Sequence, residues 1–190
     1  MIAEMIVRAA TLIATFGLAA EAAQAQFRLT SPDLAPGGTL HDEQAYDSFG
    51  CTGQNVSPAL KWTGAPKDTK SFALLVHDPD APTGGAGWWH WLVYDIPAGT
   101  SELAKGAGKG DGSALPQGAA SGITDYGAPG YGGPCPPAGD KPHRYVFTLY
   151  ALKVAKLDVP SDAKASLIGF MVNANALGKA TLTGMYGRRK

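Results

Sequence analysis

The sequence is poor in charge, and its charges cancel. Charged residues make up 17% of the 190 residues, and the 16 basic and 16 acidic side chains leave a formal net charge of zero. A balanced chain of this kind argues against nucleic acid as a partner. Hydrophobic residues, at 45%, instead indicate one globular domain with a substantial core.

Catalytic and metal-binding motifs are also missing. The chain contains neither the HExxH motif of zinc proteases nor the GxSxG turn that presents a nucleophilic serine. Cys51 and Cys135 are its only cysteines, and no CxxC pair or nearby histidine pair accompanies them, so they do not form a zinc site by themselves. We therefore expect a non-enzymatic protein without a cofactor.

The first 25 residues have the pattern of an export signal. Arg8 precedes an apolar run over residues 9–20, and Ala23-Gln24-Ala25 has the small-x-small form of a signal-peptidase site. The run is too short to span a membrane comfortably, and no second transmembrane candidate follows. We expect residues 1–25 to be a cleaved signal peptide and residues 26–190 to form one exported domain, periplasmic in a Gram-negative cell and otherwise secreted. An uncleaved anchor or a wrong start codon is the alternative.

Two cysteines in an exported chain fit a single disulfide. A bond between Cys51 and Cys135 would close a loop of more than about eighty residues, for which the chain-entropy model gives about 4–5 kcal/mol of stabilisation. The alternative is a pair of buried thiols that never meet, and the sequence leaves both open.

Hydrophobic patterns predict a mainly β protein. Ser71–Asp78 is apolar on both faces, which is typical of a central strand with cover on each side, and Trp88–Ile96 and His143–Leu152 are two further core strands. Weaker strand patterns lie at residues 26–30, 57–62, 119–123 and 180–187. Ser161 fits the N-cap of a helix over residues 162–177. Strands joined by long Pro-rich loops indicate a β-sandwich or a related all-β core.

Polar side chains stand in apolar company at the ends of the confident strands: Asp78, His90, His143 and Tyr145. Alternation along a strand predicts that His143 and Tyr145 share a face, and that His90 shares a face with Leu92. A single histidine in such a position is more often a satisfied core residue than a ligand. Two histidines with Asp78 and Tyr145, each beside a Gly/Pro loop, favour one common site, because ionisable groups on apolar faces need partners.

The chemistry of this group suits a small anion. His90 and His143 can donate N–H bonds to an anionic oxygen, and Tyr145 can donate its hydroxyl hydrogen. We expect backbone N–H groups around Gly133 to add to these donors. An ionised Asp78 only accepts hydrogen bonds, so it can fix a histidine tautomer or take an ammonium group of the ligand. The set predicts a site for a phosphate monoester, or for a head group that carries phosphate and amine.

Three motifs carry a family resemblance, and they are Asp78-Pro79-Asp80-Ala81-Pro82, Trp89-His90-Trp91-Leu92-Val93, and Gly133-Pro134-Cys135-Pro136-Pro137 followed by His143-Arg144-Tyr145. In this order they resemble the phosphatidylethanolamine-binding protein family, and the Gly-Pro-Cys-Pro-Pro form is similar to its bacterial, Raf-kinase-inhibitor-like branch. The resemblance covers nearly all of the chain after residue 25. One departure is Ala174-Asn175, where many bacterial relatives carry Gly-His.

The resemblance implies a large central β-sheet packed against a smaller one, with a C-terminal helix. It also implies a shallow pocket for phosphate, acetate or phosphoethanolamine-like groups, lined by Asp78, Asp80, His90, Gly133, Pro134, His143 and Tyr145. Eukaryotic members bind kinases and other partners, so an inhibitor or interaction module that docks a partner in the pocket is the alternative function. A hydrolase, or a zinc enzyme that uses His90, His143 and Asp78, is a further alternative.

Overall fold

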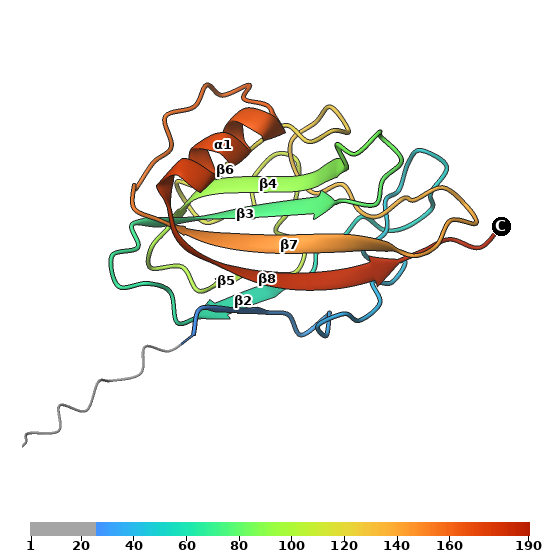
Figure 1. Cartoon of the computed structure of the whole chain (residues 1–190), viewed down its shortest axis with the longest axis horizontal. Helices are drawn as coiled ribbons and strands as arrows, with labels where there is room; N and C mark the ends of the chain where they lie inside the picture. The colour runs from blue at the N-terminus through green and yellow to red at the C-terminus, as the bar shows by residue number, and fades with distance from the viewer. Residues whose placement is uncertain (1–25) are drawn as a thin grey trace, which may run out of the picture.

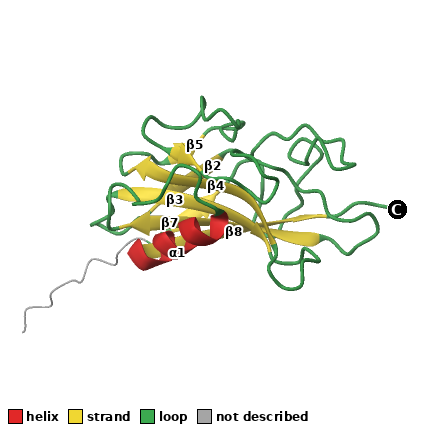
Figure 2. Ribbon diagram, turned by 90° about the horizontal axis from the view of Figure 1, so that it is seen from above, coloured by secondary structure: helices red, strands yellow, loops and turns green. Residues whose placement is uncertain are grey.

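Strand-forming segments dominate the chain, and they pair into two β-sheets packed face to face, with one helix on the outer face of the larger sheet (Figure 1, Figure 2). The computed structural model describes residues 26–190. The expected signal peptide, residues 1–25, lies outside the described residues and stays a prediction. Within residues 26–190, no helix is long and apolar enough to cross a membrane.

Five strands form the larger sheet in the spatial order β6-β4-β3-β7-β8, and every neighbouring pair is antiparallel. They are β3 (Ser71–Asp78), β4 (Trp88–Pro97), β6 (Ala120–Ser121), β7 (His143–Leu152) and β8 (Ala176–Tyr186). β3 lies at the centre, and all of its residues except His77 are buried. The prediction of a central strand with cover on both faces is thus confirmed.

The smaller sheet consists of β1 (Arg28–Thr30), β2 (Leu60–Thr63) and β5 (Glu102–Leu103) in the order β1-β2-β5, again antiparallel. Buried and exposed residues alternate along β2, as expected for a strand with one face on a core. The core between the sheets includes Leu29, Leu60, Trp62, Phe72, Leu74, Trp91, Phe147 and Leu149. This arrangement confirms the expected sandwich of a large antiparallel sheet and a smaller one.

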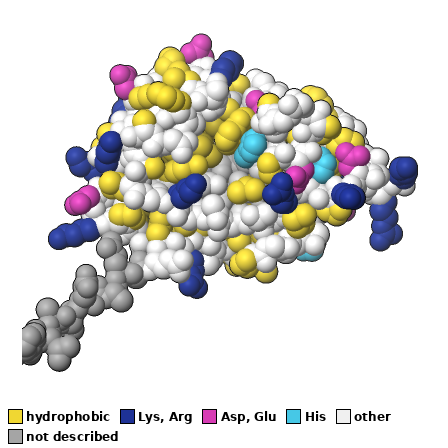
Figure 3. Space-filling model, in the orientation of Figure 1, with side chains coloured by type: hydrophobic (Ala, Val, Ile, Leu, Met, Phe, Trp, Pro, Cys, Tyr) yellow, Lys and Arg dark blue, Asp and Glu magenta, His cyan; other side chains and the backbone are white. Residues whose placement is uncertain are grey.

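The other face of the larger sheet is covered by α1 (Ala165–Asn175). Ile168 and Val172, one turn apart on the same side of α1, are fully buried in a cluster with Leu75 and Leu92. The outer side of α1 is also apolar, and Phe170 is 69% exposed. Apolar side chains accordingly gather on the surface over α1 in Figure 3. Packing of the inner side against the sheet therefore holds this short helix in place.

Most of the weaker predicted ranges differ from the observed elements at one end or both, and the shifts at the start of α1 and of β8 follow from tertiary pairing. The expected N-cap, Ser161, lies in a turn, whereas Lys164 has an extended backbone, forms a bridge with Ile123 and precedes the first turn of α1. At the other end, β8 begins at Ala176 instead of residue 180, because it pairs with β7 along the full length of that strand.

Two loops that are far apart in the sequence are joined beside the larger sheet. Cys51 and Cys135 form a disulfide across a sequence separation of 84 residues, which confirms the expected pairing. Arg188 donates from Nη1 to the carbonyl oxygen of Gly50 (2.8 Å) and from Nε to that of Pro136 (2.7 Å). The guanidinium group thus holds together the same two loops as the disulfide.

We expect the disulfide to contribute about 4–5 kcal/mol to the free energy of unfolding, because it restricts the unfolded chain over a separation of 84 residues. The double variant Cys51→Ser, Cys135→Ser should unfold at a lower urea concentration while keeping its β-sheet circular dichroism. Reduced wild-type protein should unfold at the same urea concentration as the double variant. Equal unfolding midpoints for oxidised and reduced wild-type protein would contradict this expectation.

Candidate functional site

The candidate site forms where three neighbouring strands meet at one edge of the larger sheet. β3 runs toward this edge and ends at Asp78, whereas β4 and β7 start from it at Trp88 and His143, because both are antiparallel to β3. The polar side chains singled out in the sequence are brought together here, and all are nearly fully buried: Asp78, His90, His143 and Tyr145.

His143 and Asp78 form a direct pair. Nδ1 of His143 lies 2.8 Å from Oδ2 of Asp78, and Oδ1 of Asp78 accepts the backbone N–H of Asp80 at 2.8 Å. An ionised carboxylate only accepts hydrogen bonds, so Nδ1 of His143 carries a proton and Nε2 is left for other contacts. Among residues 26–190, no three His, Cys, Asp or Glu side chains are grouped so that they could hold a metal ion.

A β-bulge directs His90 into the site. On β3, Val76 pairs with Trp91 and the next residue, His77, pairs with Trp89, so His90 is an extra residue on β4. Regular alternation predicts that His90 shares a face with Leu92, and this prediction is wrong. The ring of His90 lies 5.0 Å from that of Tyr145, on the side of the smaller sheet, while Trp89 packs with the cluster beneath α1.

The two ring nitrogens of His90 have different surroundings. Nδ1 lies 2.7 Å from the carbonyl oxygen of Gly132 and donates to it, whereas Nε2 is buried with no hydrogen-bond partner among the described residues. Burial lowers the pKa of His90 to about 4, although the carbonyl of Gly132 and the charge of Asp78 act in the opposite direction. His90 is therefore neutral at pH 7, with its lone pair on Nε2.

Two more buried polar atoms beside His90 lack partners. The hydroxyl of Tyr145 and the indole N–H of Trp88 make no hydrogen bond within the part of the chain that the structure describes. Burial, and then the charge of Asp78, raises the pKa of Tyr145, so its hydroxyl keeps its proton. All these residues and His143 line one pocket of about 230 Å³. Buried polar groups without partners are rare in folded proteins. The others among residues 26–190 are the indole N–H groups of Trp62 and Trp91 in the core, and the three that share this pocket make it the candidate ligand site.

Apolar and aromatic groups form most of the remaining wall, which consists of Phe49, Ala81, Pro82, Thr83, Tyr126, Cys135, Pro136 and Pro137. Neither Trp88 nor Tyr126 is among the site residues expected from the sequence. The ring of Tyr126 packs edge to face against those of Trp88 and His90, at 5.4 and 5.6 Å. An aromatic residue within a long Gly-rich loop, with no strand pattern to explain it, is the signal that could have identified Tyr126.

Asp80, which the family resemblance implies as a pocket residue, lies outside the pocket lining. Its carboxylate pairs with Arg144, whose Nη2 and Nε lie 2.6 and 2.9 Å from the two oxygens. This pair holds the pKa of Asp80 down, at about 2. Asp80 also donates its backbone N–H to Asp78, so it supports the site through the loop rather than by facing a ligand.

Gly133 and Pro134, also implied by the resemblance, shape the loop behind the pocket. The N–H of Gly133 donates to Oδ1 of Asn55 at 2.8 Å, so the expected contribution of this N–H to an anion site is wrong. A Cβ atom at position 133 would lie 2.0 Å from the carbonyl oxygen of Gln44, which requires glycine there. The carbonyl oxygen of Pro134 accepts the N–H of Tyr46.

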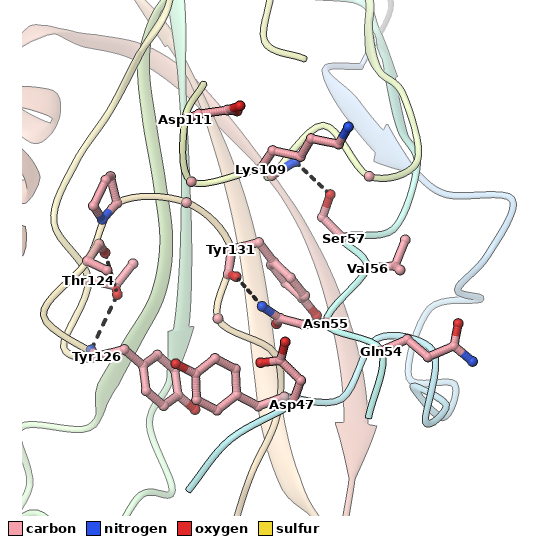
Figure 4. A pocket seen from close by; sticks show the side chains of 18 residues that line it. Asp47, Gln54, Asn55, Val56, Ser57, Lys109, Asp111, Thr124, Tyr126 and Tyr131 are labelled. Atoms are coloured by element: carbon pink, nitrogen blue, oxygen red, sulfur yellow. Dashed lines mark hydrogen bonds between the residues drawn. The ribbon is translucent and has the colours of Figure 1, made fainter. Parts of the chain in front are cut away.

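A second hollow, of about 640 Å³, shares Tyr126 with this pocket (Figure 4). Polar groups in its wall already have partners, since Asn55 donates to the carbonyl oxygen of Tyr131 and Ser57 Oγ accepts the N–H of Gly108. Within residues 26–190, none of the buried polar atoms that lack partners belongs to its lining. The smaller pocket is therefore the better candidate for a specific ligand.

The buried, neutral His90 should make the protein lose stability in mild acid. Its pKa is about 4 in the folded protein and about 6.5 in an unfolded chain. Between these values only the unfolded state takes up the proton, so stability falls as the pH falls. Urea denaturation should show the free energy of unfolding dropping by about 2–3 kcal/mol between about pH 7 and about pH 4.5 from this group.

The exposed His41 offers a matched control for this experiment. His90→Gln should lose much less of its free energy of unfolding than wild type when the pH is lowered, whereas His41→Gln should lose as much as wild type. An equal loss in wild type and His90→Gln would show that His90 is not the source.

A profile of the phosphatidylethanolamine-binding protein family matches residues 30–187. The chain is similar to the Escherichia coli (strain K12) protein YbcL, with 47% identity over 176 residues that cover 93% of this chain and 94% of YbcL. It is also similar to YbhB of the same organism, with 42% identity over 159 residues that cover 84% of this chain and 99% of YbhB.

The likeness extends to a solved structure and to a relative in Mycobacterium tuberculosis. The crystal structure of YbcL, described as a new member of the mammalian PEBP family, matches with a TM-score of 0.84 at 48% identity and covers 87% of this chain and 100% of that chain. LppC of Mycobacterium tuberculosis, named as a candidate lipoprotein, is 37% identical over 158 residues, which cover 83% of this chain and 71% of LppC. Motifs, fold and relatives agree, and the chain belongs to the phosphatidylethanolamine-binding protein family.

Proposed function

We propose that this protein binds small phosphorylated or otherwise anionic ligands, such as phosphate or a phosphoethanolamine-type head group, in the pocket around His90 and His143, and that it catalyses no reaction. The observation that carries the proposal is the presence of three buried polar atoms without partners, on Trp88, His90 and Tyr145, in one pocket. Each such atom costs about 1–3 kcal/mol, so a ligand that pairs with all three has a strong driving force to bind.

The donors around the pocket suit an oxyanion. The indole N–H of Trp88 and the hydroxyl of Tyr145 can both donate to oxygens of a ligand. His143 lines the same pocket, and its hydrogen bond to Asp78 holds the ring in place. Asp78 itself is occupied by His143 and by the N–H of Asp80, so its charge is compensated within the protein.

The size and wall of the pocket favour a small head group. Its volume of about 230 Å³ lies below the roughly 300–1,000 Å³ of pockets for drug-sized molecules. The prolines and aromatic rings of the rim can contact the short carbon chain of such a group, while the polar atoms at its base contact the phosphate. An apolar rim above polar atoms suits a phosphoethanolamine-type ligand, which carries a phosphate and a short carbon chain.

Phe49 favours a second candidate function, an interaction or inhibitor module. Its side chain lines the pocket and is 68% exposed, and its ring lies 5.9 and 5.5 Å from those of Tyr46 and Tyr126. Aromatic side chains are frequent anchors in protein interfaces. A partner whose phosphate or acidic group enters the pocket would therefore find an apolar contact at its edge.

Export of the protein is part of the proposal. The apolar run and the small-x-small site within residues 1–25 support it. The disulfide between Cys51 and Cys135 supports it as well, because disulfides persist in oxidising compartments. The similarity to LppC, a candidate lipoprotein, is in keeping with a location outside the cytoplasm.

Titration with phosphate or phosphoethanolamine should shift the imidazole NMR signals of His90 and His143 and leave those of the exposed His41 unchanged. Tyr145→Phe removes one donor to the anion, so it should weaken binding about tenfold or more, since hydrogen bonds to charged groups contribute roughly 1.5–3 kcal/mol. His41→Gln is the matched control and should bind with wild-type affinity. If no anion shifts either pocket histidine, the proposed function is wrong.

The mature protein, isolated from the exported fraction of a Gram-negative host, should begin at Gln26 in N-terminal sequencing. The double variant Ala23→Leu, Ala25→Leu should accumulate as an uncleaved precursor, because signal peptidase requires small residues at these positions. Recovery of the chain from the cytoplasm with residues 1–25 attached would refute the export proposal.

A further inference from the structure

We propose that ligand binding in this pocket is coupled to a proton: the site takes a phosphate monoester or inorganic phosphate in its singly protonated form, whose P–O–H group donates a hydrogen bond to Nε2 of His90. The inference rests on the proposed function and adds the protonation state of the ligand. It follows from a contrast between His90 and His143, which line the same pocket but are fixed by different hydrogen-bond partners.

The acceptor role of His90 follows from its contact with Gly132. A carbonyl oxygen only accepts hydrogen bonds, so the 2.7 Å contact requires a proton on Nδ1. A neutral imidazole has only one N–H, which leaves a lone pair on Nε2. Nε2 is buried without a partner among residues 26–190, on a side chain that lines the pocket. A ligand group that reaches Nε2 must therefore bring a hydrogen-bond donor.

The surroundings keep His90 neutral in the free protein. The residue is 3% exposed, and burial lowers its pKa to about 4. Asp78 favours a proton on His90, but it is already paired with His143, and burial outweighs its effect. The ionisable groups that line the pocket with His90 are Asp78 on β3, His143 and Tyr145 on β7, and Tyr126 on the loop before β7. His77 on β3 packs against Trp89 outside the pocket and acts on His90 only through its charge.

His143 is held by a carboxylate instead of a backbone carbonyl oxygen. Its Nδ1–H donates to Asp78 at 2.8 Å, and its Nε2 lies 3.6 Å from a carboxylate oxygen of Asp140. The hydrogen bond to Asp78 places a proton on Nδ1, whereas 3.6 Å is too long for a hydrogen bond between Nε2 and Asp140. The buried pocket atoms without partners among residues 26–190 are thus one acceptor, Nε2 of His90, and two donors, the hydroxyl of Tyr145 and the indole N–H of Trp88.

The protonation state of a phosphate decides whether it fits this set. A dianion offers only acceptors, so one of its oxygens would face the lone pair of His90. The singly protonated form offers an O–H for His90 and unprotonated oxygens for Tyr145 and Trp88. A phosphodiester is a monoanion without a P–O–H group, so it leaves Nε2 of His90 unpaired and should bind on the order of tenfold more weakly.

Isothermal titration calorimetry with methyl phosphate tests the coupling. The second pKa of this ligand lies near that of phosphoserine, about 6, so at about pH 8 it is mostly a dianion. Binding at about pH 8 should take up about one proton per ligand, read from the change of measured enthalpy between buffers of different ionisation enthalpy. The affinity should fall about tenfold per pH unit above about pH 6, and the uptake should approach zero at about pH 5.

Two diesters separate a lipid head group from a free phosphate as the ligand. Dimethyl phosphate has neither a P–O–H nor an ammonium group, and glycerophosphoethanolamine has an ammonium group that could donate to Nε2 of His90. Both should bind more weakly than methyl phosphate at about pH 6. If glycerophosphoethanolamine binds as tightly as methyl phosphate and takes up no proton, the ammonium group occupies the position assigned to P–O–H, and the inference is overturned.

Variants locate the proton. His90→Gln replaces the acceptor by an amide that can itself donate, so the proton uptake and the pH slope should disappear, whereas His41→Gln should keep both. Uptake that persists in His90→Gln would overturn the inference, because the proton would then reside elsewhere in the complex. The nitrogen NMR chemical shifts of the His90 ring in the free wild-type protein provide a test without a variant. A proton on Nε2 near neutral pH would also overturn the inference.

The calorimetry distinguishes this inference from the proposed function on which it rests. If methyl phosphate binds wild-type protein at about pH 8 without proton uptake, the coupling is wrong and the anion site stands. If neither phosphate, methyl phosphate nor phosphoethanolamine binds at any pH at which the protein is folded, the proposed function itself is wrong, and the inference falls with it.

Discussion

Antiparallel pairing of β3 with both of its neighbours is the constraint on which the candidate site depends. Because β4 and β7 run opposite to β3, the end of β3 at Asp78 meets their first residues at one edge of the sheet. Cover on both faces of the sheet buries the polar side chains there, so most of their groups need a partner within the protein. The hydrogen bonds of His143 with Asp78 and of His90 with Gly132 are responses to that burial.

The loops around this edge are held as firmly as the strands. The disulfide and Arg188 join the same two loops, and Asn55 binds the backbone of both Tyr131 and Gly133. These contacts pair the N–H of Gly133 and the carbonyl oxygens of Gly50, Tyr131 and Pro136 within the protein. What remains unpaired is a small set of side-chain atoms in fixed positions, and such preorganisation lowers the entropic cost of binding.

Much of the fold could be predicted because local pattern and tertiary environment agree. Ser71–Asp78 and His143–Leu152 have the bounds expected from the sequence, since their apolar runs are also the segments that the two core clusters bury. Prediction failed where pairing with a distant segment set the backbone conformation. The bridge to Ile123 keeps Lys164 extended and delays α1, and pairing with β7 extends β8 back to Ala176.

For the site, the sequence by itself indicated four of the polar side chains, because an Asp, two His and a Tyr within apolar strands carry their hydrogen-bonding needs into the core. It did not single out the indole N–H of Trp88. It could not determine the direction of His90, because a bulge exists only relative to the strand that pairs with it. It could not assign the N–H of Gly133 either, because the acceptor on Asn55 lies 78 residues away in the chain. Only the tertiary structure decided which polar groups satisfy one another and which are left for a ligand, since that choice depends on distances between segments that no local pattern records.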